Sequence, residues 1–176
     1  MPTDVRATSF AELYVAHARP VYRFALYLCG DREIAADITS ETFLRVWTAD
    51  QPIRVDSVRT WLFVIARNVY LHEFRHLRRR AALDSTMPSA DSVSTSLEAK
   101  ETLQQTLKAL AGLPEVDRSA LLLRVVQELP YARIAAILHI SIAAAKVKVH
   151  RARVRLHLLA GGQEGDRHEP IERSHS

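Results

Sequence analysis

Apolar residues recur every three or four positions in nearly all long segments of the chain. One such stripe lies in Phe10–Ala25, a second in Ile38–Trp47 and a third in Trp61–Val69. This spacing places apolar side chains along one face of an α-helix, and Trp61 is expected in the core. No segment of useful length alternates apolar and polar residues as a half-buried strand does. The pattern predicts an all-α fold.

Capping and turn residues mark the predicted helix ends in the first half. Asp31 follows a glycine and is a favoured N-cap residue, so a helix is predicted to begin there. Asp50-Gln51-Pro52 ends that helix, because proline disfavours helical backbone in the residue before it. A loop follows, and a third helix is predicted from near Val58 to near Arg80.

The segment Leu83–Ser96 is rich in Ser, Thr and Asp and has little apolar periodicity. Such a composition is typical of a flexible linker, so the chain is predicted to form two small helical domains. The predicted division is a first domain over residues 1–80, a linker over 81–100, a second domain over 101–160 and a polar, disordered tail over 161–176.

The second half has the spacing of a helix-turn-helix. A short amphipathic helix is predicted over Pro130–Leu138, with Pro130 at an allowed first-turn position. A tight connection follows, in which Ser141 is suited to cap the next helix, predicted from Ile142 to about Leu159. The core stripe of that helix is expected to comprise Ile142, Ala145, Val149, Ala152, Leu156 and Leu159.

Cations fill the other faces of this last helix, with no acidic residue among them. A helix of this size fits the DNA major groove, and cations along it neutralise phosphates. A helical hairpin with a solvated basic face is the alternative that this pattern leaves open. The cations are Lys146, Lys148, Arg151, Arg153 and Arg155.

Charge is distributed in blocks that match the predicted domains. The formal net charge of +4 divides into +3 over residues 1–80, −2 over 81–100, +5 over 101–160 and −2 over 161–176. Two basic blocks favour a polyanionic partner such as nucleic acid. A hydrophobic fraction of 48% excludes wholesale disorder.

Two sets of motifs stand out, one in each half of the chain. The first set comprises Ala36–Leu44, Trp47, Thr60–Leu62, Ile65-Ala66, Asn68 and Arg75. The second set comprises Leu110–Glu115, Arg118, Leu122–Arg124, Leu129–Tyr131, Ile134-Ala135, Lys146 and His150–Arg153. The first set resembles region two, and the second region four, of the bacterial RNA polymerase sigma factors of the sigma-70 family, in the small extracytoplasmic-function group. Both sets occur in the family's order, and the resemblance covers about Phe10–Arg80 and Leu103–Ala160.

The resemblance implies a promoter-specificity subunit that directs RNA polymerase to a subset of promoters and is not itself an enzyme. It implies that the helix near Val58–Arg80 reads the −10 element and helps to open it, and that the loop Asp50–Ser57 captures a flipped base. The candidate −10 residues are Arg59, Arg67, Asn68, Arg75, Arg78 and Arg79. The candidate −35 residues are Ser141, Ala143, Ala144, Lys146, Lys148, Arg151 and Arg155.

The implied partners are core RNA polymerase, through its clamp coiled coil and flap, double- and single-stranded promoter DNA, and an anti-sigma factor. In the family, the region-two helix docks on the clamp coiled coil. Asp37, Glu41 and Arg45 lie at i, i+4 and i+8, on one face of that helix here. A solvated surface ion pair between Glu41 and Arg45 is the alternative reading of this spacing.

The chain departs from the family's usual pattern at several positions. Ser40 stands where Gln is usual, His72 where Asp is, Arg133 where Glu is, and His139 where Gly is. Ala143-Ala144-Ala145 replaces a Gly-Thr-Val sequence, which leaves little at the mouth of the recognition helix to hydrogen-bond with bases. Upstream promoter contact is therefore expected either to depend on phosphates and on Lys148 and Arg151, or to have an altered specificity.

Two other functions remain as hypotheses. One is a stand-alone helix-turn-helix regulator that binds duplex DNA without polymerase. The other is a zinc metallopeptidase, because His72-Glu73-Phe74-Arg75-His76 matches the H-E-x-x-H motif. A catalytic zinc needs a third protein ligand, and the candidates Glu98 and Glu101 lie across the predicted linker. We therefore expect no metal, no cofactor and no catalytic residue.

Cys29 is the only cysteine, which excludes an internal disulfide and favours a reducing compartment. It is expected to be a small buried apolar residue. No uninterrupted apolar run approaches the roughly 20 residues that span a bilayer, and the first ten residues lack the apolar region of a signal peptide. A cytoplasmic protein without membrane insertion is expected.

Overall fold

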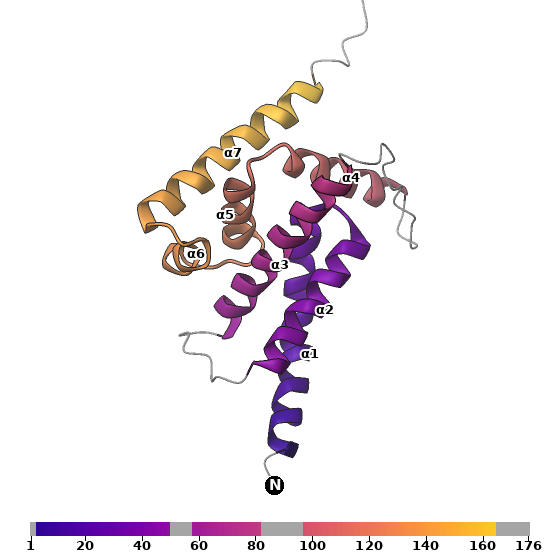
Figure 1. The fold of residues 1–176 in the computed structure, drawn as a ribbon. Coiled ribbons are helices and arrows are strands. Elements are labelled where there is room, and N and C mark those ends of the chain that lie inside the picture. The colour runs from indigo at the N-terminus through magenta and orange to yellow at the C-terminus, as the bar shows by residue number, and fades with distance from the viewer. Residues whose placement is uncertain (1–2, 50–57, 82–96, 165–176) are drawn as a thin grey trace, which may run out of the picture.

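The computed structural model describes residues 3–49, 58–81 and 97–164, with the backbone alone described for 3–9, 74–81, 97 and 160–164. These ranges contain helices and no strand, so the all-α prediction is confirmed. None of the described helices is long and apolar enough to cross a membrane. The helices in Figure 1 are α1 Thr3–Cys29, α2 Arg32–Thr48, α3 Val58–Ala81, α4 Leu97–Ala111, α5 Glu115–Val125, α6 Tyr131–Leu138 and α7 Ile142–Glu164.

Both predicted N-caps are confirmed. The Ile34 backbone amide donates to Asp31 Oδ1 at 2.9 Å at the start of α2. The Ala144 amide donates to Ser141 Oγ at 3.0 Å at the start of α7. Each cap satisfies an amide that has no partner within the helix, and so fixes where the helix begins. The loop predicted over Asp50–Ser57 lies outside the described residues.

The turn between α6 and α7 uses a left-handed residue that is not glycine. His139 has φ 54° and ψ 44°, and its amide donates to the Ala135 carbonyl. Glycine is favoured at this position because it has no Cβ to clash in the left-handed region. The turn therefore forms as predicted for a helix-turn-helix, but with backbone strain at His139.

The first three helices pack around a shared apolar core. Phe24 of α1 and Phe63 of α3 are fully buried, and their rings meet edge to face with centroids 5.2 Å apart. Ile38 of α2 and Leu62 of α3 are equally buried beside them. Ile38 and Leu62 belong to the stripes predicted from periodicity, whereas Phe24 and Phe63 were not among the predicted stripe residues.

The predicted core stripe of α7 is correct in its middle and wrong at its ends. Ala145, Val149 and Ala152 are buried, whereas Ile142 and Leu159 are exposed. The buried stretch of α7 packs against α5 and α6, and the helix extends beyond both of them (Figure 1). Periodicity alone identifies the face of a helix but does not show where its neighbours end.

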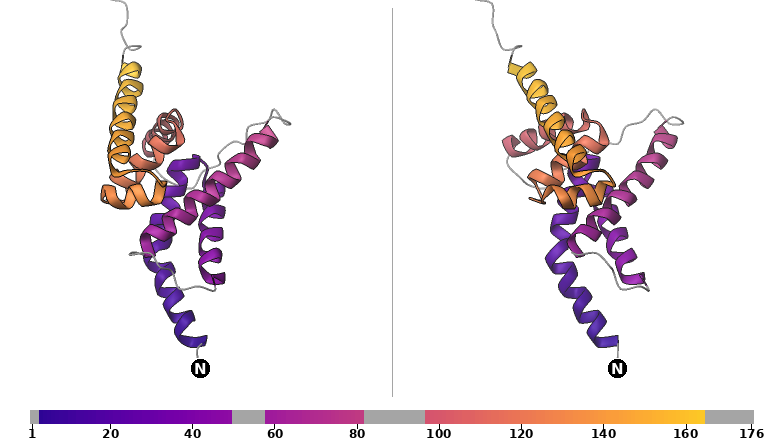
Figure 2. Two further views of the ribbon diagram at one scale, coloured as in Figure 1. Left: turned by 60° about the vertical axis from the view of Figure 1, so that its left-hand side comes forward. Right: turned by 90° about the vertical axis from the view of Figure 1, so that its left-hand side faces the viewer.

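The two halves of the chain pack against each other. Helix α1 contacts α4 and α5, and α3 contacts α6. Buried apolar residues of both halves form one continuous cluster. The C-terminal ends of α3 and α7 point away from this contact in different directions (Figure 2).

The predicted linker and tail are each partly helical. Leu97–Lys100 form the first turn of α4, and the last residues of α7, 161–164, were predicted as tail. The rest of the predicted linker, residues 82–96, lies outside the described residues, as does the rest of the tail.

Four aromatic residues of the predicted apolar stripes are not fully buried: Phe10 and Trp61 are half-buried, and Tyr14 and Trp47 are exposed. Trp61 is half-buried in the first turn of α3. Trp47 is 52% exposed at the end of α2, where its ring packs edge to face on Phe10 of α1 at 4.8 Å. The end of a helix has fewer neighbours to cover a large side chain than its middle has, and this explains the exposure of Trp47.

Candidate nucleic-acid interface

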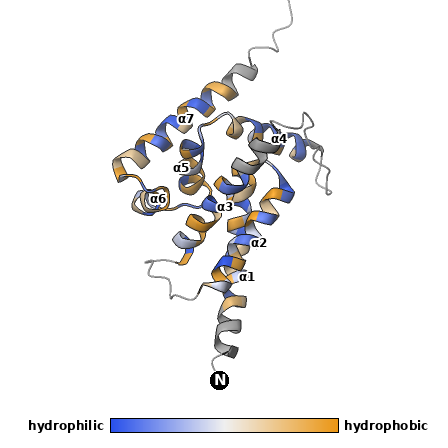
Figure 3. Ribbon diagram, in the orientation of Figure 1, coloured by the Kyte–Doolittle hydropathy of each residue, from blue (hydrophilic) through white to orange (hydrophobic). Residues whose placement is uncertain are grey.

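A stripe of cations follows one side of α7, next to its buried face. Ala144, Lys148, Arg151 and Arg155 are spaced by four, three and four residues, which places them on one helix face. Lys148, Arg151 and Arg155 line a hollow of about 460 Å³ between α5 and α7. Along its length α7 alternates between hydrophilic and hydrophobic residues (Figure 3). We call Lys148, Arg151 and Arg155 the α7 cation stripe.

Within this stripe the arginines and the lysine have different surroundings. Arg151 and Arg155 are exposed. Lys148 is half-buried, and its Nζ lies 3.1 Å from Oδ1 of Asp117, a buried residue of α5. A buried carboxylate requires a partner to offset its desolvation, so Lys148 ties α7 to α5.

Lys146 lies on another side of α7. Its Nζ is 5.9 Å from the ring centroid of Tyr131, the first residue of α6. The Arg124 guanidinium lies 4.9 Å from the same centroid and donates to the Leu129 carbonyl at 3.1 Å. Attraction between cations and the ring face holds this cluster together. The predicted −35 residues therefore divide between two sides of the helix.

The first turn of α7 offers few groups that could hydrogen-bond to bases. Ser141 is exposed, but its hydroxyl oxygen already caps the helix. Ala143 is exposed and Ala144 half-exposed, and neither carries a polar side-chain atom. Contact of this turn with base edges would rest on methyl groups and not on hydrogen bonds.

One face of α3 points into the second half of the chain. Arg59, Phe63, Arg67 and Tyr70 are spaced by four, four and three residues, and we call them the α3 interface face. Arg59 Nη2 donates to the backbone carbonyl of Gln127 at 2.8 Å and to its Oε1 at 3.2 Å. This residue, predicted to contact DNA, is therefore bonded to the turn between α5 and α6.

Arg67 forms a two-pronged ion pair with Glu115, the first residue of α5. Its Nε and Nη2 donate to the two carboxylate oxygens at 2.8 and 2.7 Å. Both side chains are largely buried, with 11% and 21% of their surfaces exposed. Ser119 Oγ donates to the same carboxylate at 2.7 Å. Arg67 thus has little surface left to offer DNA in this arrangement.

The same interface has a third polar contact. Arg118 of α5 donates from Nη2 to the phenol oxygen of Tyr70 at 2.9 Å, in a buried setting. Burial raises the pKa of Tyr70, and the positive charge of Arg118 opposes that shift. The contact therefore pairs a neutral phenol with a guanidinium.

The other −10 candidates lie elsewhere on α3. Asn68 is exposed to solvent. Arg75, Arg78 and Arg79 belong to the helix, but their side chains lie outside the described residues. Positions 68, 72, 75 and 79 share a face by their spacing. The prediction remains open for Asn68, Arg75, Arg78 and Arg79.

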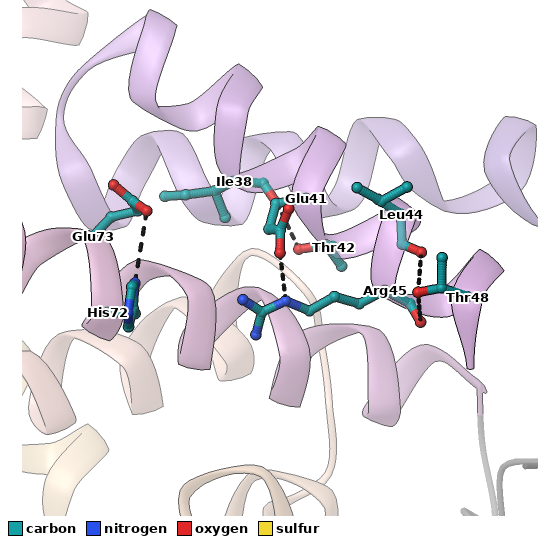
Figure 4. Close-up of polar contacts among 8 residues, drawn as sticks. All are labelled: Ile38, Glu41, Thr42, Leu44, Arg45, Thr48, His72 and Glu73. Carbon is teal, nitrogen blue, oxygen red and sulfur yellow. Dashed lines mark hydrogen bonds and ion pairs between the residues drawn. The ribbon is translucent and has the colours of Figure 1, made fainter. Parts of the chain in front are cut away.

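The H-E-x-x-H motif lies on the same helix. His72 Nδ1 is 3.8 Å from Glu73 Oε1, and both side chains are exposed (Figure 4). The side chain of His76 lies outside the described residues. Among the described residues, no group of three or more His, Cys, Asp or Glu side chains could hold a metal ion.

The candidate polymerase-docking face lies on α2. Asp37 is exposed, and Arg45 Nε donates to Glu41 Oε1 at 2.6 Å across an exposed pair (Figure 4). Leu44, with 55% of its surface exposed, and Trp47 lie beside them. The sequence analysis assigned Trp47 to the core. It did not include Leu44 in the docking face, although Leu44 follows Asp37 by seven positions and Glu41 by three, a spacing that places all three on one helix face. The face therefore combines charged and apolar side chains.

Cys29 is half-buried at the end of α1. Its Sγ donates to the Asp31 carbonyl at 3.1 Å. Burial raises the pKa of the thiol to about 11, so it stays protonated and unreactive near neutral pH. The expectation of a small apolar role is met only in part, because Cys29 is not fully buried.

Two family models match the chain in order. Sigma-70 region 2 matches residues 13–80, and Sigma-70 region 4 matches residues 103–156. The ECF RNA polymerase sigma factor SigM of Bacillus subtilis is 30% identical over 84% of this chain and 93% of its own length. SigL of Mycobacterium tuberculosis is 34% identical over 80% of this chain and 82% of its own.

Solved structures show the same arrangement of helices. The sigma factor RpoE of Bartonella quintana, in complex with the anti-sigma factor NepR, has a TM-score of 0.75 and 26% identity, over 87% of this chain and 97% of that one. CnrH in complex with the cytosolic domain of CnrY has a TM-score of 0.71 and 21% identity, over 89% of this chain and 90% of that one, and supports the fold alone. The chain belongs to the ECF group of sigma-70 family RNA polymerase sigma factors, which are non-enzymatic subunits of transcription initiation.

Proposed function

We propose that the two halves of this sigma factor bind the two promoter elements. In this proposal residues 1–80 engage core polymerase and the −10 element, residues 101–160 engage the −35 element, and residues 81–100 connect them. The observation that carries the proposal is the α7 cation stripe, whose arginines are exposed on a helix with a capped start. Cations placed along such a helix neutralise phosphates of the major groove.

For the −35 element, Arg151 and Arg155 are the principal proposed phosphate contacts. Lys148 contributes less, because Asp117 already offsets its charge. Ser141, Ala143 and Ala144 lie at the start of α7, where residues of a recognition helix face base edges. Lys146 would reach DNA only from the side of the helix that faces Tyr131.

For the −10 element, the proposal separates two groups of residues on α3. Asn68, Arg75 and Arg79 share a helix face on which Asn68 is exposed, and Arg78 precedes Arg79 on the same helix. Arg59 and Arg67 carry suitable charge, but both are bonded to the second half of the chain. Their contact with single-stranded DNA requires that the halves separate.

The proposed protein partners are core RNA polymerase and an anti-sigma factor. Asp37, Glu41 and Arg45, with the exposed Leu44 and Trp47, form the proposed docking face for the polymerase clamp. On such a face the charged groups orient the partner, and the apolar residues supply binding energy when they are buried. An anti-sigma partner is proposed because the similar RpoE structure contains one. Action with polymerase places the protein in the cytoplasm.

Run-off transcription with purified core polymerase tests this proposal. A random promoter library should yield promoter-dependent transcripts only when the protein is present. Arg151→Ala combined with Arg155→Ala should reduce that yield. Arg153→Ala is the matched control, because Arg153 lies on the same helix but lines a different hollow, with Tyr27. No stimulated transcript, or equal loss in the control, would reject the proposal.

A further inference from the structure

We propose that a hollow between α4, α5 and α7 binds a small amphipathic carboxylate, a molecule with one anionic group and one aliphatic chain. The hollow has a volume of about 640 Å³, and Tyr27 of α1 lines one side of it. Small-molecule sites in proteins occupy roughly 300–1,000 Å³. We call this space the α4–α7 hollow. It is separate from the α7 cation stripe, because no residue of that stripe lines it.

The lining of the α4–α7 hollow is mostly aliphatic. Leu110 of α4 and Leu121 and Leu122 of α5 are buried, so they lie at the bottom of the hollow. Val125 is 52% exposed at its edge, and Leu156 of α7 is half-buried. An aliphatic chain gains free energy when it displaces water from such a surface. A sugar or a nucleotide would lose its hydration there without new hydrogen bonds, so the lining favours a hydrocarbon chain.

A second hollow adjoins the first along α4. It has a volume of about 530 Å³, and Thr106, Leu110 and Leu156 line both hollows. Ala109 and Leu159 add further apolar atoms to the second one. Two adjoining hollows with a shared apolar boundary suit an elongated ligand better than a compact one. A chain that fills the α4–α7 hollow can therefore extend into the second.

Two basic side chains stand at the edge of the α4–α7 hollow. Arg153 and His157 are four residues apart on α7, which places them one above the other on one helix face. Both are exposed, and in the part of the chain that the structure describes neither side chain forms an ion pair or a hydrogen bond. Among the described residues that line the hollow, none is acidic.

This edge is complementary to a carboxylate. A guanidinium binds a carboxylate through two parallel hydrogen bonds, and an imidazole ring nitrogen can donate a third. The anionic group would bind to Arg153 and His157 in this way, while the attached chain covers the leucines below. The charge and the shape of the ligand are thus both set by the residues of one hollow.

The cations of α7 are thereby divided between two ligands. Arg155 lines the hollow on the side of the α7 cation stripe, and Arg153 lines the α4–α7 hollow. Residues two positions apart lie on nearly opposite sides of a helix. A duplex on the stripe and a carboxylate at Arg153 therefore use different arginines. This separation supplies a matched pair of variants.

Isothermal titration calorimetry on the full chain tests the site with sodium octanoate, decanoate and laurate, each below its micellar concentration. One molecule should bind per chain, with a Kd for laurate of about 0.1 mM. Affinity should rise about twofold to fourfold for each added methylene, because each one covers more aliphatic surface. Decyltrimethylammonium has the same chain as decanoate with the opposite charge, and it should bind about tenfold more weakly.

Substitutions at the edge of the hollow test its two parts. Arg153→Ala should weaken decanoate binding about threefold to fivefold, and Arg153→Lys should retain most of the affinity. Val125→Trp places a large ring in the hollow and should weaken binding by about tenfold or more. Because Val125 is exposed, this variant is expected to fold, which circular dichroism checks.

Arg155→Ala is the matched control. It removes an exposed arginine from the same helix and should leave the affinity for decanoate unchanged. The two variants should exchange their effects when a fluorescein-labelled duplex is the probe, because Arg155 belongs to the α7 cation stripe and Arg153 does not. Equal losses of decanoate affinity in both would overturn the proposal, since overall charge alone would then explain binding.

Three other results would also overturn it. One is the absence of saturable binding of decanoate and laurate up to about 1 mM. Another is binding of many molecules per chain, which would indicate detergent-like association. The third is concentration-dependent dimerisation in analytical ultracentrifugation that Val125→Trp abolishes and laurate does not affect, which would assign the hollow to a second copy of the chain. If Val125→Trp does not fold, the comparison of Arg153→Ala with Arg155→Ala decides.

Discussion

The arginines of α3 and those of α7 differ in what surrounds them, although both helices were predicted to bind DNA. The prediction for α3 came from the family resemblance, and that for α7 came from the helix-turn-helix spacing and its cations. Arg67 is paired with a carboxylate in a largely buried contact, whereas Arg151 faces solvent. A cation is available to a polyanion only if nothing in the protein already holds it. Basic charge in a sequence therefore indicates a capacity for DNA binding, and the fold decides when that capacity is expressed.

The largest expected difference between the two helices concerns stability. Arg67→Ala should lower the free energy of unfolding by about 2–3 kcal/mol, because it leaves the Glu115 carboxylate largely buried without its cation. Arg151→Ala should change it by no more than about 0.5 kcal/mol, as exposed residues do. Urea unfolding followed by circular dichroism measures both. Similar losses in the two variants would show that the arginines do not differ.

A smaller effect on stability is expected at Lys148, whose side chain is half-buried and paired with Asp117. It is therefore intermediate between the buried Arg67 and the exposed Arg151. Asp117→Asn should cost about 1 kcal/mol of stability, because it removes the charge that Lys148 neutralises. The freed ammonium should also strengthen duplex binding. The slope of log affinity against log salt concentration should steepen by up to about 0.9. Titrations of a labelled duplex at several salt concentrations measure this. A weaker affinity for the duplex would mean that Asp117 positions Lys148 for DNA.

Arg151→Ala should weaken duplex binding severalfold with almost no effect on the fold. Loss of one phosphate contact should reduce the slope of log affinity against log salt concentration by about 0.9. Arg153→Ala is the control on the opposite side of α7. The account fails at this point if the two variants lose equal affinity.

The smallest effect is expected at the exposed pair on α2, which is the counterpart of the buried pair between Arg67 and Glu115. Glu41→Gln should change the free energy of unfolding by less than about 0.5 kcal/mol, because water screens the contact with Arg45. It should still weaken binding to core polymerase if this face docks there. Thermal unfolding and a pull-down with core polymerase measure the two effects separately. A stability loss as large as that of Arg67→Ala would be unexpected.

Interactions local in sequence were predictable, and those between the halves were not. The caps at Asp31 and Ser141 each join residues three positions apart, so the sequence displays both partners together. The pair between Arg67 and Glu115 spans 48 residues, and the bond from Gln127 to Pro20 spans 107. No periodicity or local motif links such partners.

Exposure at helix ends was also beyond sequence reasoning. Trp47 follows the apolar period of α2 and was assigned to the core, yet 52% of its surface is exposed, with Phe10 of α1 packed edge to face on its ring. His139 adopts a left-handed backbone that favours glycine. Neighbouring helices impose both outcomes, and their positions are set by packing across the whole chain.

Arginine modification by phenylglyoxal, followed by peptide mass spectrometry, tests the central contrast most directly. In the intact protein, Arg151 and Arg155 should be modified rapidly, and Arg59 and Arg67 slowly. In Glu115→Gln, the rate at Arg67 should rise while the rate at Arg151 stays the same. Equal rates at Arg67 and Arg151 in the unmutated protein would contradict the account.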